Sequence, residues 1–150
     1  MKRSRTAWAL ALLVAVTACG DDSVAAADAA SPHVQVNELF LRTADNATFA
    51  RTEMIDRRWA PERITLRADE GRAVRVVYLG FDNREFTLDG ARMHQTRGTV
   101  EGTAVRWVAD GAHGRLEAVH SGIARFRVSV FHIDHTDFDS PWLTIEVPAP

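Results

Sequence analysis

One short segment holds most of the side chains that suggest chemistry. Residues 132–139 (HIDHTDFD) contain two imidazoles and three carboxylates within eight residues. Imidazole and carboxylate ligands together suit Cu(II), Zn(II) or Ni(II). If the preceding strand continues with Val130 facing inward, His132 also faces inward and His135 lies in the turn. A metal site would then need His135 together with a distant partner such as His94 or His113.

Spacing alone does not establish such a site, because no strong metal-binding template matches it. The simpler interpretation, which the sequence favours, is a solvated acidic loop with one histidine that caps the core. Asp134, Asp137 and Asp139 also suggest calcium, but the segment lacks the glycine turn and the terminal glutamate of an EF-hand loop. The chain has no G-x-S-x-G, H-E-x-x-H or Gly-rich phosphate-binding motif. We therefore predict no catalytic residues and no enzyme activity.

The N-terminus predicts export. Residues 1–18 combine a positive start, a ten-residue apolar run (7–16) that is too short to span a bilayer, and small residues before Cys19. The sequence Val16-Thr17-Ala18-Cys19 resembles the lipobox of bacterial lipoproteins, in which the cysteine is acylated and becomes the new N-terminus. The alternative is an ordinary secretory signal that is cut near Ala18. With lipid on Cys19, an otherwise soluble domain would be tethered to a membrane.

The predicted organisation follows from this signal. Residues 19–32 comprise the lipidated cysteine and a stalk of Ala, Asp and Ser that contains too little apolar surface to fold. Residues 33–150 are long enough for one domain with its own core. Removal of residues 1–18 leaves 15 basic and 20 acidic residues, a formal charge of −5. This charge argues against nucleic acid or anionic lipid as the main partner.

A period of two dominates the domain and predicts strands. Apolar residues alternate with polar ones most clearly in three segments, and less clearly in five more that are bounded by turn residues. The clear segments are 73–79, 124–130 and 143–147, and the weaker ones are 34–41, 63–66, 85–88, 103–108 and 115–119. Residues 47–59 show no clean alternation, so a helical turn and an irregular crossover are equally compatible with them. About eight short strands predict an all-β antiparallel sandwich or barrel.

Three passages of the domain resemble the cupredoxin family, whose fold is a Greek-key β-sandwich. Residues 60–71 (APERITLRADEG) are similar to its P-x-x-I-x-V-x-x-G segment, and residues 82–88 (DNREFTL) to the segment that carries the first copper histidine. Residues 124–130 (ARFRVSV), a histidine-bearing loop and residues 142–147 (WLTIEV) resemble the family's C-terminal ligand region. The resemblance spans roughly residues 34–147.

The departures from this family fall on its copper ligands. Arg84 stands where the first histidine is expected, Val130 where the cysteine is expected, and Asp139 where the methionine is expected, while His135 matches the second histidine. Blue copper needs a thiolate, and the only cysteine is Cys19. The resemblance therefore implies a domain without type 1 copper. We expect Arg84 to pair with a carboxylate such as Glu85 or Asp139.

These observations predict an exported lipoprotein, anchored by its N-terminal lipid with the domain facing the periplasm or the cell exterior. Its leading predicted role is a non-redox binding or structural module that engages an envelope protein or a small ligand and needs no cofactor. The alternative is a Cu(II) or Zn(II) carrier or sensor that uses His135, His132, His94 and Asp139. A further alternative is an accessory module of an envelope oxidase or reductase.

Overall fold

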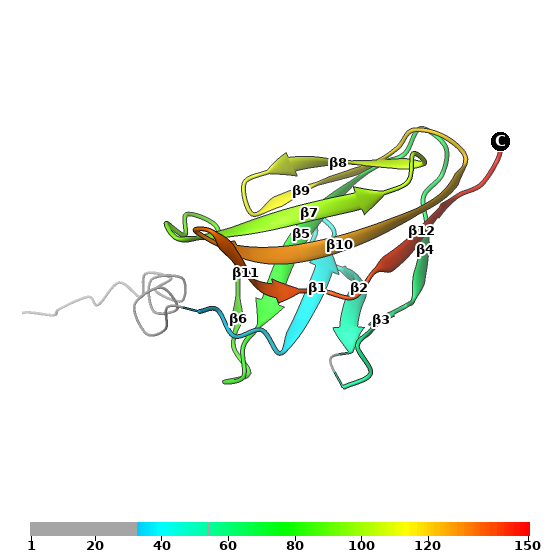
Figure 1. The fold of residues 1–150 in the computed structure, drawn as a ribbon. Coiled ribbons are helices and arrows are strands. Elements are labelled where there is room, and N and C mark those ends of the chain that lie inside the picture. Colours follow the sequence, from blue (N-terminus) through cyan, green and yellow to red (C-terminus); the bar gives the residue numbers. More distant parts are fainter. Residues whose placement is uncertain (1–32, 54) are drawn as a thin grey trace, which may run out of the picture.

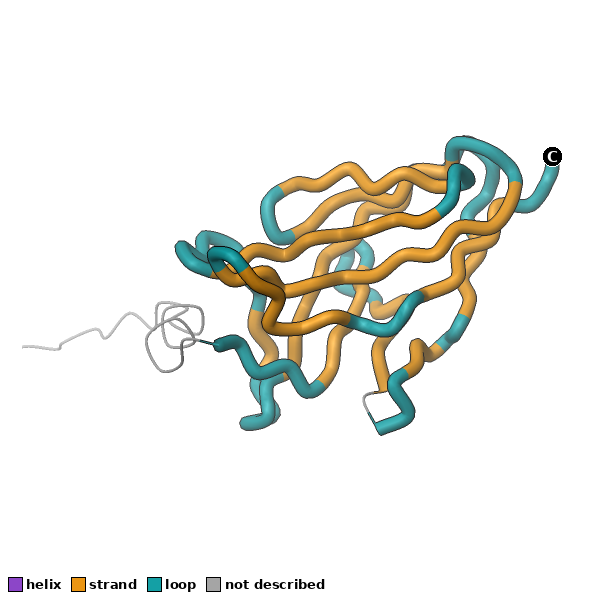
Figure 2. Tube along the Cα trace, in the orientation of Figure 1, coloured by secondary structure: helices purple, strands orange, loops and turns teal. Residues whose placement is uncertain are grey.

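The computed structural model describes residues 33–53 and 55–150, so the predicted signal peptide, Cys19 and the stalk lie outside the described residues. The described chain consists of strands and loops, as Figure 2 shows. The strands are β1 (Glu38–Arg42), β2 (Thr48–Glu53), β3 (Arg58–Ala60), β4 (Arg63–Thr65), β5 (Gly71–Leu79), β6 (Glu85–Phe86), β7 (His94–Glu101), β8 (Val105–Asp110), β9 (His113–Ala118), β10 (Gly122–His132), β11 (His135–Asp139) and β12 (Leu143–Val147).

The strands form two sheets, and the predicted all-β sandwich is confirmed. One sheet has the order β3-β2-β1-β5-β9-β8, with β6 also paired to β5. The other has the order β11-β10-β12-β4, with β7 along the remaining edge of β10. In Figure 1, β7 and β10 run across the front of the view, and β1 and β5 lie behind them. All pairings are antiparallel except the one between β4 and β12, which is parallel and was not expected.

The core lies between the two sheets. Its largest fully buried side chains include Trp59, Tyr78, Phe126 and Leu143. The alternation predicted for residues 124–130 is confirmed, because Phe126, Val128 and Val130 in β10 are all completely buried. Val130, the residue at the expected cysteine position, is therefore part of the core.

Residues 47–59 contain strands β2 and β3, so the expected helical turn or irregular crossover was wrong. The inward positions of β2 hold Ala50 and Thr52, which are small or polar and give little hydrophobic alternation. The Thr52 hydroxyl accepts a hydrogen bond from the Leu39 amide at 2.8 Å. Trp59 then anchors β3 in the core and donates its indole N–H to the Pro141 carbonyl at 2.6 Å. Tertiary contacts thus stabilise these two strands, although their local sequence lacks the apolar alternation that predicts a strand.

Strand β7 was not predicted, although it pairs with β10 over eight residues. Its inward positions alternate from His94 through Gly98 to Val100, and most of these side chains are polar or small. The glycine has a packing role, because a Cβ built on Gly98 would lie 2.6 Å from the indole of Trp107. Because β7 uses a glycine to make room for Trp107 of β8, its own sequence shows little apolar alternation. The described residues thus form twelve strands where about eight were expected.

Candidate metal centre

Two adjacent strands bring the first pair of histidines together. Strand β10 continues past Val130, and His132 at its end is 94% buried on the inward side, as predicted. A two-residue turn of Ile133 and Asp134 connects it to β11, so that His132 and His135 face each other in register. Their ring centroids lie 5.1 Å apart. The hairpin therefore positions two imidazoles at one end of the sandwich.

A β-bulge in β11 determines which carboxylate joins them. His132 pairs with His135 and Phe131 with Thr136, but Val130 pairs with Phe138, so Asp137 is the extra residue in the ladder. A bulge reverses the inward and outward alternation beyond it and redirects a side chain. The Asp137 side chain is consequently only 2% exposed and lies beside the histidines.

The same bulge turns Asp139 away from the histidines, so the predicted ligand role of Asp139 is not supported by its position. Asp139 accepts a hydrogen bond from the Ser129 hydroxyl and lies 3.6 Å from the Arg127 guanidinium. Simple alternation would have placed residues 135, 137 and 139 on one face, and the extra residue breaks that pattern.

The third histidine comes from the segment before β1. His33 Nδ1 lies 2.9 Å from Asp137 Oδ1, and the amide of Val34 donates to Asp137 Oδ2 at 3.1 Å. Val34 and Val36 are buried, which holds this segment against the domain. His33 was not among the predicted ligands. Nothing in its local sequence marks it, because its partners are more than 100 residues away.

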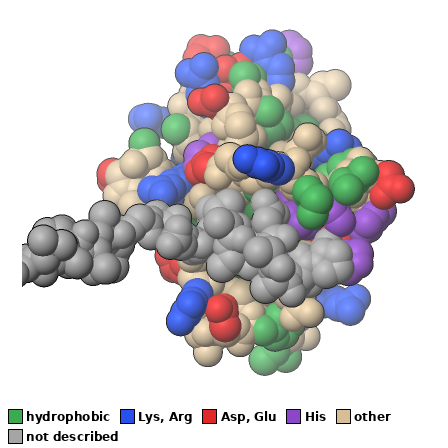
Figure 3. All heavy atoms as spheres, turned by 90° about the vertical axis from the view of Figure 1, so that its left-hand side faces the viewer, with side chains coloured by type: hydrophobic (Ala, Val, Ile, Leu, Met, Phe, Trp, Pro, Cys, Tyr) green, Lys and Arg blue, Asp and Glu red, His purple; other side chains and the backbone are tan. Residues whose placement is uncertain are grey.

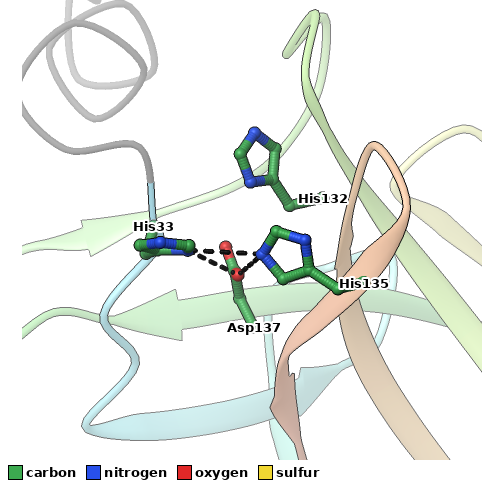
Figure 4. A group of neighbouring side chains, drawn as sticks. All are labelled: His33, His132, His135 and Asp137. Carbon is green, nitrogen blue, oxygen red and sulfur yellow. Dashed lines mark hydrogen bonds and ion pairs between the residues drawn. The ribbon is translucent and has the colours of Figure 1, made fainter.

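These four side chains converge on one point, as Figure 4 shows. One nitrogen each of His33, His132 and His135 and one oxygen of Asp137 all lie within 4.8 Å of one another. His135 Nε2 is 3.0 Å from Asp137 Oδ1 and 3.4 Å from His33 Nδ1. In a tetrahedral zinc site with bonds of about 2.0–2.1 Å, neighbouring ligand atoms are about 3.3 Å apart. Three of the four donor atoms thus already approach the spacing of one tetrahedral face.

His132 supplies an independent indication of a ligand. Neither of its ring nitrogens has a hydrogen-bond partner among the described residues, although the ring is buried. Buried polar atoms in proteins are nearly always paired, and leaving one unpaired costs about 1–3 kcal/mol. A metal ion bound by one of these nitrogens would give that atom a partner, and the ring lies beside the other three donors.

Other side chains orient these four donors from outside the cluster. The Asp134 carboxylate lies 2.8 Å from His135 Nδ1, which directs Nε2 of the same ring toward the cluster. Metal-binding histidines commonly donate their other N–H to such a carboxylate. His94, a predicted ligand, lies behind the cluster: it stacks on His132 with centroids 4.5 Å apart, and its Nε2 is 3.4 Å from Asp137 Oδ2. From this position His94 can orient His132 and Asp137, and it is not itself one of the four converging donors.

The electrostatics of the cluster favour an anionic Asp137 beside cationic or metal-binding imidazoles. Burial raises the pKa of Asp137, but hydrogen bonds from His33 and the Val34 amide and the charges of His33 and His132 outweigh it, so the pKa is lowered. The hydrogen bond to Asp134 raises the pKa of His135, with further contributions from the charges of Asp137 and Asp134. The lowered pKa keeps Asp137 available as an anionic ligand, whereas a metal ion that binds His135 must displace the proton that its raised pKa favours.

The remaining predicted residues lie elsewhere. His113 accepts a hydrogen bond from the Val76 amide and contacts Asp89 at 2.8 Å, so it is not part of the cluster. The expected pairing of Arg84 with Glu85 or Asp139 was wrong. Arg84 lies in a turn next to Asp82. Its side chain is 85% exposed, with Nε 3.9 Å from the Asp82 carboxylate. Glu85 pairs instead with Arg42 at 2.6 Å.

Figure 3 shows the domain from the side where the described chain begins, and histidine side chains gather on this face near hydrophobic ones. Comparisons with protein-family models, curated proteins and solved structures found no match for this chain. The resemblance to cupredoxins therefore stays a prediction. Within residues 33–53 and 55–150, no helix is long and apolar enough to cross a membrane.

Proposed function

We propose that this protein is an exported, lipid-anchored metal-binding module that holds a divalent ion through His33, His132, His135 and Asp137. The observation that carries the proposal is the convergence of three imidazoles and one buried carboxylate from three separate segments. The buried His132 ring, moreover, has no hydrogen-bond partner within residues 33–53 and 55–150. Of the roles considered from the sequence, this convergence favours the metal carrier or sensor over the module that needs no metal.

The donor set favours Zn(II). Three nitrogens and one oxygen make a closed four-coordinate set, and zinc accepts such sets in tetrahedral geometry. Cu(II) prefers a square-planar or tetragonal arrangement, which the spacing of His33, His135 and Asp137 fits less well. The cluster contains neither a thiolate nor a thioether, the ligands that suit Cu(I). Cu(II) is the second candidate, because imidazole and carboxylate also bind it.

Calorimetric titration of the purified full-length chain with zinc chloride tests this proposal. We expect one ion per chain with a dissociation constant below about 1 μM, a binding free energy beyond about −8 kcal/mol. The double variant His132→Ala/His135→Ala should lose this binding. His120→Ala, which removes an exposed loop histidine outside the cluster, should keep it. If the unmodified chain bound no stoichiometric zinc, the proposal would be refuted. The domain would then be a structural or binding module that takes no metal.

A further inference from the structure

His33 differs from the other three donors in where it sits on the chain. His132, His135 and Asp137 lie within six residues of one hairpin, β10–β11. His33 precedes β1 and is separated from His135 by 102 positions and from Asp137 by 104. An ion bound by all four side chains would therefore join two distant parts of the chain.

The segment that carries His33 is attached to the domain at its two ends. At Asn37, the amide donates to the Leu79 carbonyl at 2.7 Å, just before β1 begins. At the other end, both the His33 ring and the Val34 amide bind the carboxylate of Asp137. Residues 33–37 form no strand, so no sheet ladder holds them between these two points. The outer end of the segment is thus held by the buried Val34 side chain and by Asp137, which is itself a proposed metal ligand.

We propose that the metal ion is a clasp that fastens residues 33–37 to the β10–β11 hairpin and fixes the point at which residues 1–32 join the domain. This inference rests on the proposed function, because it assigns a consequence to the same site. His33 lies only four positions before the attachment at Asn37, so closing this short loop costs little conformational entropy. If the hairpin alone bound the ion, the ion would have one protein ligand fewer. The segment would then be held only by the burial of Val34 and Val36 and by the hydrogen bonds to Asp137.

Hydrogen exchange measured by mass spectrometry on the purified full-length chain, with and without zinc, tests the clasp. In the unmodified chain, zinc should slow exchange in peptides from residues 33–39 and also in peptides from residues 129–139. In His33→Ala, zinc should slow exchange in the hairpin only. The zinc affinity should fall by at least about 100-fold, because loss of a direct ligand exceeds the 10–100-fold typical for an outer-shell partner. His120→Ala serves as the control and should behave like the unmodified chain.

X-ray absorption spectroscopy of the zinc-loaded chains provides a readout that does not depend on exchange rates. We expect three imidazoles in the unmodified chain and two in His33→Ala. Equal affinity and equal imidazole number in both chains would overturn the clasp while leaving the metal site in place. Failure of the unmodified chain to bind zinc would overturn the proposed function and the clasp together. His33→Gln repeats the test with a polar side chain of similar size, should His33→Ala not fold.

Discussion

Asp137→Asn and Asp139→Asn form a matched pair of substitutions that tests the bulge in β11. Both change the same residue type on the same strand, two positions apart. Asp137 is 2% exposed and lies within 3.1 Å of donors on His33, His135 and Val34. Asp139 is 44% exposed and faces Ser129 and Arg127. Only the first substitution should affect both metal binding and the buried cluster.

The magnitude follows from these contacts. An asparagine at 137 keeps one oxygen, but it converts two contacts with imidazoles from charged to neutral at a loss of about 1 kcal/mol each. For a domain of about 118 residues, the entropy of unfolding is roughly 0.25 kcal/mol/K, so about 2 kcal/mol lowers the Tm by about 8 °C. Zinc at 100 times its Kd should add about 2.7 kcal/mol, or about 11 °C, to the unmodified chain and nothing to Asp137→Asn.

Calorimetric or fluorescence-detected unfolding with and without zinc measures both quantities. Asp139→Asn loses a solvent-exposed contact worth at most about 1 kcal/mol, so its Tm should fall by no more than about 4 °C. It should also retain the full shift with zinc. If Asp137→Asn retained the zinc shift while Asp139→Asn lost it, the assignment of the inward carboxylate to the bulged residue would be refuted.

Three further predictions concern stability. Ile133 has a φ of +47° and is 70% exposed, so Ile133→Gly should raise the free energy of unfolding by about 0.5–1 kcal/mol in denaturant titrations. Gly98→Ala should lower it by about 1–3 kcal/mol, because the new Cβ meets the rigid indole of Trp107, whereas the control Gly71→Ala meets only the flexible Arg115 side chain and should change it little. Burial raises the pKa of Tyr78, outweighing its hydrogen bond to Thr96. The resulting stability is complete below the ordinary tyrosine pKa of about 10 and is lost as the pH rises above it. Because Tyr78 is the only tyrosine, tyrosinate absorbance should appear only together with unfolding, and its appearance in the folded protein would contradict this account.

The sequence was sufficient to predict the fold class and half of the cluster. Alternation in β5, β10 and β12 is strong because these central strands bury large apolar residues on one face. The same alternation, extended from Val130, correctly placed His132 on the inward side. A local period of two is enough for these statements, because each depends only on a residue and its near neighbours along one strand.

The tertiary structure decided the rest of the cluster. The bulge that turns Asp137 inward and Asp139 outward depends on how β11 registers against β10, and register is set by the partner strand. His33 joins the cluster because Val34 and Val36 pack into the domain and carry the preceding residue across to the hairpin. Strands β2 and β7 were not predicted because their inward side chains are small or polar and give no apolar alternation. Side chains of neighbouring strands fill the core at these positions. The residue types thus indicated which side chains could bind a metal ion, and long-range packing determined which of them come into contact.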